Sequence, residues 1–306
     1  MFNDLFQEDG LSLERLHALI LLEDNGSLIR AANGDSGRQS RLSHYIKELS
    51  GFFGVELTER VGKTIRLSQA GMELTVMIRR HLSDITRFKR NVSNLPPTFR
   101  FGAGESLLQW LVIPSLPQMQ STPEQIHFIL SNLRTQEINA RLQDQRLDVG
   151  LLREDAVAVG LKRKPACSIK YVVVVPQRIV GRRRQLSLKE ALLNYPHAAL
   201  AGDGAMRASL DRIAGDFGGL YVPQLQCDSI AQCVAAVKTT HFAAVLPSWA
   251  WQPEAGIEHL VCEDPGLAQL RRSLVLAWHP RLVETHGEKV KELVDGMANT
   301  FRQKCK

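Results

Sequence analysis

The sequence lacks any apolar run long enough to cross a membrane. A bilayer-spanning helix needs roughly 20 consecutive apolar residues. The longest apolar runs of this 306-residue chain, such as residues 171–175, have the length of a strand. Residues 1–9 are acidic and lack the basic and then apolar plan of a signal peptide. We therefore expect no membrane partner and a cytoplasmic location.

The motifs of metal sites and of common enzymes are also missing. The five cysteines form no CxxC pair and no zinc-like cluster with histidine, which indicates reduced thiols, with a redox-sensing pair among them as an alternative. No phosphate loop or dinucleotide fingerprint is present, since Gly102-x-Gly104 lacks the remaining glycine. We expect no enzyme, no cofactor and no metal. A thiol hydrolase using a cysteine such as Cys227 is an alternative, although no base lies beside it in the sequence.

What the sequence does contain is a local excess of positive charge. The net charge is +6, which is only a mild bias toward polyanionic partners. Between Arg30 and Arg66, however, seven basic residues stand against four acidic ones. A chain of this length suits two or three domains, so the basic segment is expected to form a surface of one of them.

The N-terminal segment shows short helices separated by polar turns. An amphipathic helix that buries Leu16, Leu19 and Ile20 is expected to end at Gly26, with Ser27 capping a very short helix over residues 28–33. After a turn over residues 34–37, Ser36 and Gln39 have the spacing of a capping box. They predict a third helix that runs to about Phe53 and ends at Gly54. Its predicted buried face contains Leu42, Ile46, Leu49 and Phe53, and its other face Arg38, Arg41, His44, Tyr45 and Lys47.

Two short extended pieces and one long helix follow. Residues 57–60 and 64–67, turned at Gly62-Lys63, predict the hairpin wing of a winged helix. A helix is then expected from residues 68–71 to just before Pro96-Pro97, on the order of 40 Å long. Its apolar stripe indicates pairing between subunits, with packing on its own domain as the alternative. The stripe contains Leu74, Ile78, Leu82, Ile85 and Val92.

From residue 99 onward strands alternate with helices, which predicts open α/β sheets. The expected strands are 100–104, 127–130, 147–152, 171–175, 242–246 and 273–278. The expected helices are 107–119, 136–145, 188–193, 207–214, 229–238 and 286–302. The basic runs at 162–164 and 182–184 are interpreted as solvated loops.

Several segments resemble the helix-turn-helix of LysR-type transcriptional regulators. They are residues 26–32 (GSLIRAA), 39–43 (QSRLS), 54–57 (GVEL), 59–60 (ER) and 66–71 (RLSQAG), in the order and spacing of that family. The C-terminal part is similar more loosely, through Gly102, Ser106 and Pro114, residues 146–150 (RLDVG) and 245–247 (VLP).

This resemblance implies an α/β protein with an N-terminal winged helix-turn-helix, a long linker helix and a periplasmic-binding-protein-like sensor of two lobes. The expected domains are the winged helix-turn-helix over 1–67, the linker and dimerisation helix over 68–95, and the effector-binding domain over 99–306. Lobe 1 is expected at about 99–170 and 273–306, and lobe 2 at about 171–272. The implied partners are double-stranded DNA, a small-molecule effector between the lobes, and further copies of the chain in a homodimer or homotetramer through the linker helix and sensor domain.

The chain departs from the family pattern at four positions. Asp35 stands where leucine is usual, Arg38 replaces a serine, and Ser50 and Thr58 replace glutamate and phenylalanine. Burying an unpaired polar group costs on the order of 2–7 kcal/mol. We therefore expect Asp35 to be exposed or to cap a helix, with the second helix shortened.

The recognition helix of a winged helix-turn-helix enters the major groove. Near its start, Arg38 and Arg41 are expected to read guanine, and Gln39 and Ser40 to contact base edges or phosphates. For any single one of these residues the alternative is a solvated surface side chain. A second set is expected to contact the DNA and mainly to hold its phosphates: Arg30, Ser43, His44, Lys47, Arg60, Lys63 and Arg66. For the effector, the candidates at strand ends and helix starts are Ser106, Asn132, Gly204 and Ser229, each of which has simple helix capping or solvation as its alternative.

The sequence thus predicts a sequence-specific DNA-binding transcription regulator controlled by a small molecule. The alternative is a cytosolic small-molecule sensor that acts through protein contacts without sequence-specific DNA binding.

Overall fold

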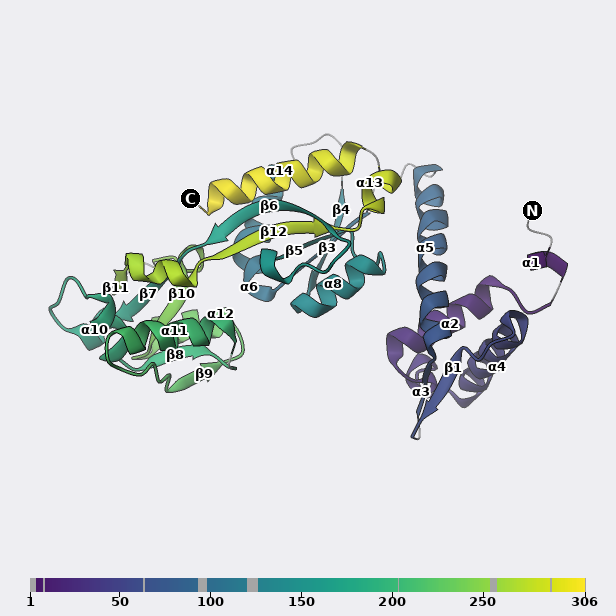
Figure 1. Cartoon of the computed structure of the whole chain (residues 1–306), viewed down its shortest axis with the longest axis horizontal. Helices are drawn as coiled ribbons and strands as arrows, with labels where there is room; N and C mark the ends of the chain where they lie inside the picture. Colours follow the sequence, from purple (N-terminus) through teal and green to yellow (C-terminus); the bar gives the residue numbers. More distant parts are fainter. Residues whose placement is uncertain are drawn as a thin grey trace. The chain divides into compact units, whose positions relative to one another are not determined.

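The computed structural model describes residues 4–7, 9–62, 64–92, 98–119, 126–202, 204–253, 258–286 and 288–305. The chain divides into two compact units (Figure 1). The first contains Met1–Pro97 and Asp144–Arg146, and the second Thr98–Gln143 and Leu147–Lys306. No helix among the described residues is both long and apolar enough to span a bilayer.

The first unit is a group of short helices with a two-stranded hairpin. The helices are α1 (Asp4–Gln7), α2 (Leu13–Asn25), α3 (Leu28–Ala31), α4 (Ser36–Phe53) and α5 (Gln69–Val92), and the hairpin strands are β1 (Thr58–Val61) and β2 (Thr64–Leu67). Their core is closed by fully buried side chains from α2, α4 and the segment before the hairpin, among them Leu19, Leu22, Leu49 and Leu57. The predicted order of helices and wing is confirmed.

Local capping explains the first two helix boundaries. Gly26 ends α2 in the left-handed conformation at φ 68°, which glycine adopts without a Cβ penalty. Ser27 then caps α3, its hydroxyl accepting a hydrogen bond from the Arg30 N–H at 3.3 Å. Both predictions are confirmed.

The start of α4 differs from the prediction. Its N-cap is Asp35, whose Oδ1 accepts the Arg38 N–H at 2.7 Å, so Ser36 lies inside the helix and the predicted capping box is wrong. Aspartate and serine are comparable N-cap residues, so the local geometry decides that the Asp35 oxygen reaches this N–H. Asp35 is exposed and caps a helix, as predicted. The second helix, α3, has only four residues, which confirms that it is shortened.

Three of the four residues predicted for the buried face of α4 are buried: Leu42, Ile46 and Leu49. Phe53 is 38% exposed, so its predicted burial is wrong. As the last residue of the helix it stands edge-on to Phe52, with ring centroids 5.0 Å apart, beyond the reach of the core.

The long helix α5 starts against the hairpin. Ser68 accepts the Gly71 N–H at 3.1 Å and donates to the Glu56 carbonyl at 2.7 Å. A Cβ at Gly71 would lie 2.1 Å from the Leu57 carbonyl oxygen, so a glycine is required where the helix meets the chain entering the hairpin. The start of α5 is therefore fixed by the hydrogen bonds of Ser68 and by the close approach of Gly71 to Leu57.

The second unit contains two five-stranded sheets. The first has the order β4-β3-β5-β12-β6, built from β3 (Thr98–Ala103), β4 (His127–Asn132), β5 (Val149–Arg153), β6 (Lys162–Ile169) and β12 (Arg272–Trp278). The second has the order β11-β7-β10-β8-β9, built from β7 (Tyr171–Pro176), β8 (His197–Leu200), β9 (Leu225–Cys227), β10 (Ala243–Pro247) and β11 (His259–Cys262). Each sheet is mixed, with parallel and antiparallel pairs.

Helices and buried side chains cover both sheets. The helices are α6 (Glu105–Leu107), α7 (Leu116–Met119), α8 (Thr135–Gln143), α9 (Gln177–Val180), α10 (Leu188–Leu193), α11 (Ala205–Asp216), α12 (Ile230–Thr239), α13 (Arg281–His286) and α14 (Glu288–Lys304). The helix predicted over 107–119 is found as one continuous helical run, but its middle is irregular: a π-helical turn (Leu108–Val112) and a 3-10 turn (Ile113–Ser115) lie between α6 and α7. Pro114 offers no N–H to a regular helix, which accounts for the irregularity.

The basic runs at residues 162–164 and 182–184 lie in different kinds of structure. Residues 182–184 lie in an exposed loop, as predicted. Residues 162–164 open β6, with Lys162 paired to Trp278, so interpreting them as a loop is wrong. Charged residues at the edge of a sheet are common because they discourage pairing with a further strand, and β6 is such an edge.

Candidate nucleic-acid interface and effector cavity

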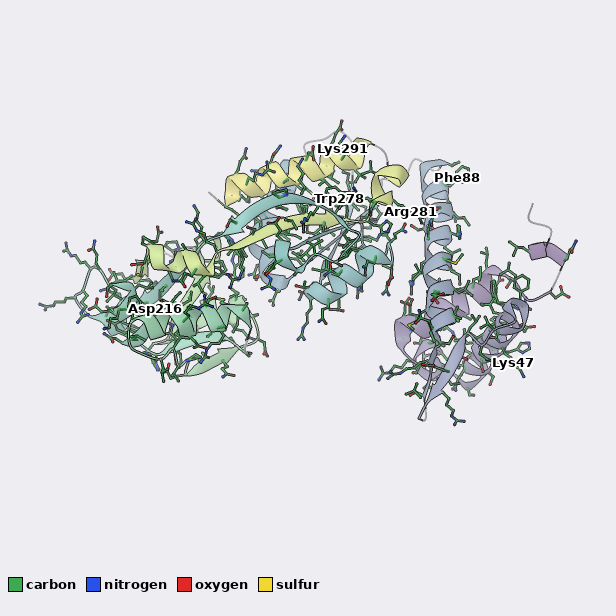
Figure 2. The ribbon with its side chains drawn as sticks, viewed as in Figure 1. Lys47, Phe88, Asp216, Trp278, Arg281 and Lys291 are labelled. Carbon is green, nitrogen blue, oxygen red and sulfur yellow. The ribbon has the colours of Figure 1, made fainter. Side chains whose placement is uncertain are left out.

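The outward face of α4 carries the predicted DNA-contact residues. Leu42, Ile46 and Leu49 anchor the helix in the core, and this fixes which side chains point outward. Gln39 is half-buried, and the remaining predicted residues of this helix are exposed: Arg38, Ser40, Arg41, Ser43, His44 and Lys47. Figure 2 shows Lys47 projecting from the helix. A helix held in this way can enter a groove without rearranging the domain.

An ion-pair network that the sequence did not indicate lies beside this face. Glu48 accepts a hydrogen bond from Arg15 of α2 at 2.8 Å, and its other oxygen lies 3.5 Å from His44 Nε2. The Arg15 hydrogen bond is the main cause that lowers the pKa of Glu48. The acidic group of α4 is thereby engaged by Arg15 of α2, while its other oxygen stays beside His44, one of the residues expected to contact DNA.

The remaining predicted DNA residues lie on other elements. Arg30 is exposed on α3, and Arg60 and Arg66 are exposed on the hairpin. The hairpin register pairs Glu59 with Arg66 and Arg60 with Ile65, so the two arginines point to opposite faces. Lys63 lies outside the described residues. The structure therefore exposes most of the predicted α4 residues on one helix, with Gln39 half-buried, but does not group Arg60 with Arg66.

The four predicted effector residues fall into two pairs. Ser106 is half-buried on α6, which follows β3, and Asn132 is exposed at the end of β4 in the first sheet. Gly204 and Ser229 are the N-caps of α11 and α12 beside the second sheet. The Ser229 hydroxyl accepts the Gln232 N–H at 3.3 Å, so it serves as a helix cap.

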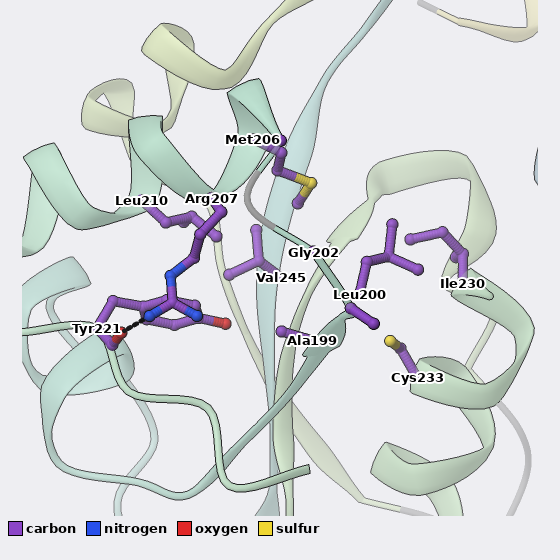
Figure 3. A pocket seen from close by; sticks show the side chains of 12 residues that line it. Ala199, Leu200, Gly202, Met206, Arg207, Leu210, Tyr221, Ile230, Cys233 and Val245 are labelled. Carbon is purple, nitrogen blue, oxygen red and sulfur yellow. Dashed lines mark hydrogen bonds between the residues drawn. The ribbon is translucent and has the colours of Figure 1, made fainter. Parts of the chain in front are cut away.

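A cavity of about 150 Å³ lies beside the second sheet (Figure 3). Of the predicted effector residues Gly204 lines it, and Ser229 directly precedes the lining residue Ile230. The other lining residues come from β8 and the loop after it, from α11, α12 and β10, and from the segment before β9: Ala199, Leu200, Ala201, Gly202, Met206, Arg207, Leu210, Tyr221, Cys233 and Val245. A cavity of this size accommodates a single-ring molecule such as benzene.

A chain of two hydrogen bonds beside the cavity, called the buried relay below, runs from Tyr221 through His197 to the Ala191 carbonyl. Tyr221, 2% exposed, lies with its hydroxyl 3.4 Å from His197 Nδ1, and His197 Nε2 lies 2.9 Å from the Ala191 carbonyl. Burial lowers the pKa of His197 to about 4, so the ring is neutral. Its Nε2–H must donate to the carbonyl, which leaves Nδ1 to accept the Tyr221 proton. The Tyr221 oxygen keeps an acceptor position for a bound molecule, and Figure 3 shows this hydroxyl pointing inward among the lining residues.

The charged and acidic groups of the cavity wall are neutral or paired. Arg207 Nε donates to both carboxylate oxygens of Asp211 at 2.9 and 3.1 Å, and Nη2 donates to the Tyr221 carbonyl at 2.8 Å. Burial raises the pKa of the Cys233 thiol to about 12, so it carries its proton at neutral pH. The wall is thus largely apolar, with one paired cation and one phenol.

Sequence reasoning missed Met206, Arg207, Tyr221 and Cys233 as cavity residues. β8 and β9 were not predicted, because strands of four and three residues leave too short a pattern to see. A prediction that lacks β8 also lacks Ala199 and Leu200, which this strand contributes to the cavity wall. Among the described residues no group of three or more His, Cys, Asp or Glu side chains is placed to hold a metal ion.

These features define a winged helix-turn-helix regulator joined to a two-sheet sensor. Residues 13–72 match the bacterial regulatory helix-turn-helix protein family, lysR type, and residues 94–301 match the LysR substrate binding domain. The chain belongs to the LysR family. It is a DNA-binding transcription regulator with an effector-binding domain and is not an enzyme. The predicted fold class and function are confirmed, and the alternatives of a sensor without DNA binding and of a thiol hydrolase are set aside.

Individual relatives are distant. The chain is 20% identical over 305 residues to the hydrogen peroxide-inducible genes activator of Haemophilus influenzae, covering 94% of this chain and 100% of that protein. A full-length OxyR variant from Pseudomonas aeruginosa has a TM-score of 0.65 at 17% identity and 95% coverage of both chains. CbnR in complex with its target DNA has a TM-score of 0.61 at 15% identity, covering 92% of this chain and 100% of that one. These likenesses show a shared fold.

Proposed function

We propose that this regulator reads its operator with α4 and holds the flanking phosphates with α3 and the wing. Base-edge contacts are assigned to Arg38, Gln39, Ser40 and Arg41. The second set, chiefly contacting phosphates, is Arg30, Ser43, His44, Lys47, Arg60, Lys63 and Arg66. The observation that carries this proposal is the exposed basic face of α4, fixed by the buried Leu42, Ile46 and Leu49 on its opposite side. A similar fold has been captured on DNA in CbnR.

The experiment is a gel-shift titration with the DNA upstream of the protein's own gene and a scrambled duplex. Arg41→Ala should lower the preference for the upstream DNA, since a bidentate arginine–guanine contact contributes roughly 1–3 kcal/mol of discrimination. Arg66→Ala should weaken both duplexes alike and reduce the dependence of affinity on salt concentration. Arg183→Ala in the sensor loop, where the arginine pairs with Glu190, is the matched control and should change neither. An equal loss on both duplexes for Arg41→Ala would remove its base-reading role.

The cavity beside α11 and α12 is proposed as an effector site. Its wall favours a small uncharged molecule with an apolar body and one hydrogen-bonding group, because the Arg207 charge is balanced by Asp211 and the cavity acids are protonated. Gly204 lines this site and Ser229 borders it. Ser106 and Asn132, which lie beside the first sheet, are proposed to contact the part of an effector that extends toward it.

Association through α5 is proposed as the route to a homodimer, with a homotetramer formed through the sensor domain. Ile78 is 4% exposed and packs in the first unit's core, whereas Ile85, Phe88 and Val92 are 57%, 71% and 70% exposed. The first half of the stripe thus packs on its own domain, and the second half is available to another helix. Figure 2 shows Phe88 standing out from the helix.

The domain division proposed for this assembly is residues 1–67, 68–95 and 99–306, with the lobes divided near residues 170 and 272. The proposed location is the cytoplasm, where the DNA target is found.

A further inference from the structure

Two of the five cysteines meet where the last long helix covers the edge of the first sheet. The thiols of Cys167, on β6, and Cys305, just after α14, are hydrogen-bonded to each other. Each is partly exposed. The residues are far apart in sequence, so their contact is created by the fold.

The helix and the strand are tied together near this contact. Lys164 of β6 forms an ion pair with Asp295 of α14, and Arg302 Nη2 donates to the Pro165 carbonyl at 2.9 Å. The Cys305 N–H donates to the Phe301 carbonyl at 3.1 Å, which continues the helix, and Phe301 is fully buried. Cys305 is therefore held at a fixed place over β6.

The strand carries an irregularity beside the other thiol. Leu274 of β12 pairs with Cys167, but the next residue, Val275, pairs with Pro165, so Ala166 is an extra residue in β6. A bulge at a sheet edge changes the direction of the neighbouring side chain. Cys167 lies at this edge strand and reaches Cys305 of the covering helix.

The two thiols differ in acidity. The pKa of Cys305 is lowered and that of Cys167 is raised, as expected of a nucleophilic thiol and the thiol that reacts with it second. The hydrogen bond from Cys167 lowers the pKa of Cys305, and the positive charge of Lys170 lowers it further. The same hydrogen bond, together with burial, raises the pKa of Cys167. The thiolate is the reactive form of cysteine, so Cys305 is the first of the pair to react.

The other thiols of the second unit lack these properties. Cys227 and Cys233 also contact each other, but both are buried. Burial raises the pKa of Cys233 to about 12, and that of Cys262 to about 11. Cys233 and Cys262 therefore stay protonated at neutral pH, and all three of these thiols are buried.

We propose that Cys305 and Cys167 form a peroxide-oxidisable pair whose disulfide fastens the end of α14 to β6. The Cys305 thiolate attacks one oxygen of hydrogen peroxide; the S–O bond forms, the O–O bond breaks, and the departing hydroxide takes a proton to give water. The Cys167 sulfur then attacks the sulfur of the Cys305 sulfenic acid. The S–S bond forms, the S–O bond breaks, and the hydroxide leaves as a second water with the Cys167 proton.

This modification lies outside the proposed DNA face and outside the effector cavity. Closing so long a loop restricts the unfolded chain and stabilises the folded one. The expected consequence is a sensor domain whose last helix can no longer leave the sheet while the cell is oxidising. Reduction of the bond by a dithiol restores the original state.

The test uses the full-length reduced protein treated with hydrogen peroxide and digested without reductant. The expected product is one linked peptide that joins Cys167 to Cys305, two hydrogens lighter than the sum of its parts and absent after dithiothreitol. Cys305→Ser and Cys167→Ser should each lose it, while Cys227→Ser, in the buried pair, should keep it. In Cys167→Ser the sulfenic acid of Cys305 should accumulate and be trapped by dimedone, whereas Cys305→Ser should give no comparable adduct on Cys167.

Three results would overturn the proposal. They are a fully alkylatable Cys305 after peroxide treatment, a link between Cys227 and Cys233 in place of the expected one, and a link found only between different molecules. The melting temperature of the reduced variants, compared with that of the reduced wild type, shows whether a lost link merely reflects a lost fold. DNA binding by the reduced protein is measured separately, so a failure of this proposal does not affect the proposed recognition by α4.

Discussion

The Oδ1 atom of Asp35 accepts a hydrogen bond from the backbone N–H of Arg38 at 2.7 Å. This contact sets the first turn of α4 and so determines where Arg38 and its neighbours project. The aspartate stands where LysR-type regulators usually carry leucine. Its charge is accommodated because it faces solvent at the start of α4. The departure therefore changes how α4 starts and leaves Leu42, Ile46 and Leu49 buried in the first unit.

Replacing this cap gives the first prediction. Asp35→Ala should lower the free energy of unfolding by about 1 kcal/mol, the typical cost of losing an N-cap side chain. Asp35→Asn removes the same charge but keeps a capping oxygen, so it should stay close to the wild type. The measurement is urea denaturation followed by helix circular dichroism. If both variants lose stability equally, charge and not capping is the important property.

Helices of this fold could be predicted from sequence because their ends carry chemical signals. Gly26, Ser27 and Gly54 mark boundaries by local rules that do not depend on the rest of the chain. The start of α4 was misplaced by one residue because Asp35 and Ser36 are both capable caps. Only the three-dimensional geometry shows which oxygen reaches the free N–H.

Short strands and the cavity could not be predicted in the same way. β8, β9 and β11 have three or four residues each, and neighbouring strands far along the chain define them. Gly204 was predicted because glycine marks a turn in the sequence. Tyr221 and Cys233 reach the same cavity from separate elements, and no spacing in the sequence relates them.

The exposed half of α5 gives the second prediction. Phe88→Asp should weaken self-association by at least about 2 kcal/mol, because a charge would replace an aromatic anchor in a buried interface. Thr86→Asp introduces the same charge at an exposed position off the apolar stripe and serves as the control. Analytical ultracentrifugation of both variants gives the dissociation constants. Equal effects, or none for Phe88→Asp, would mean that the helix pairs elsewhere.

Filling the cavity gives the third prediction. Ala199→Met places extra atoms among the lining residues and should weaken binding of single-ring compounds such as phenol at least about tenfold, or about 1.4 kcal/mol. Ala208→Met adds the same side chain at an exposed position of α11 and should leave binding unchanged. Isothermal titration calorimetry gives the affinities, and gel shifts check that both variants still bind DNA. Unchanged phenol binding in Ala199→Met would place the ligand outside the cavity.

The buried imidazole of His197 makes the stability of the second unit depend on pH. Burial lowers its pKa from 6.5 to about 4 in the folded protein, whereas the unfolded chain keeps the ordinary value. Between these two values the unfolded state binds more protons than the folded state, so stability falls as pH falls. Above pH 6.5 both states are neutral at this position and its contribution is constant. The slope for a single proton is at most about 1.4 kcal/mol per pH unit.

His197→Gln removes this proton site while keeping a polar group that can donate to the Ala191 carbonyl. The variant should be less stable than the wild type at pH 7, because the hydrogen bond to Tyr221 is disturbed. Its stability should then fall less steeply between pH 6.5 and 4, so the two curves approach each other in acid. Urea denaturation across this range measures both curves, and His241→Gln, at an exposed histidine, is the control substitution. Parallel curves for the wild type and His197→Gln would show that the imidazole has the same pKa in the folded and the unfolded protein. The buried relay would then not contribute to the loss of stability in acid.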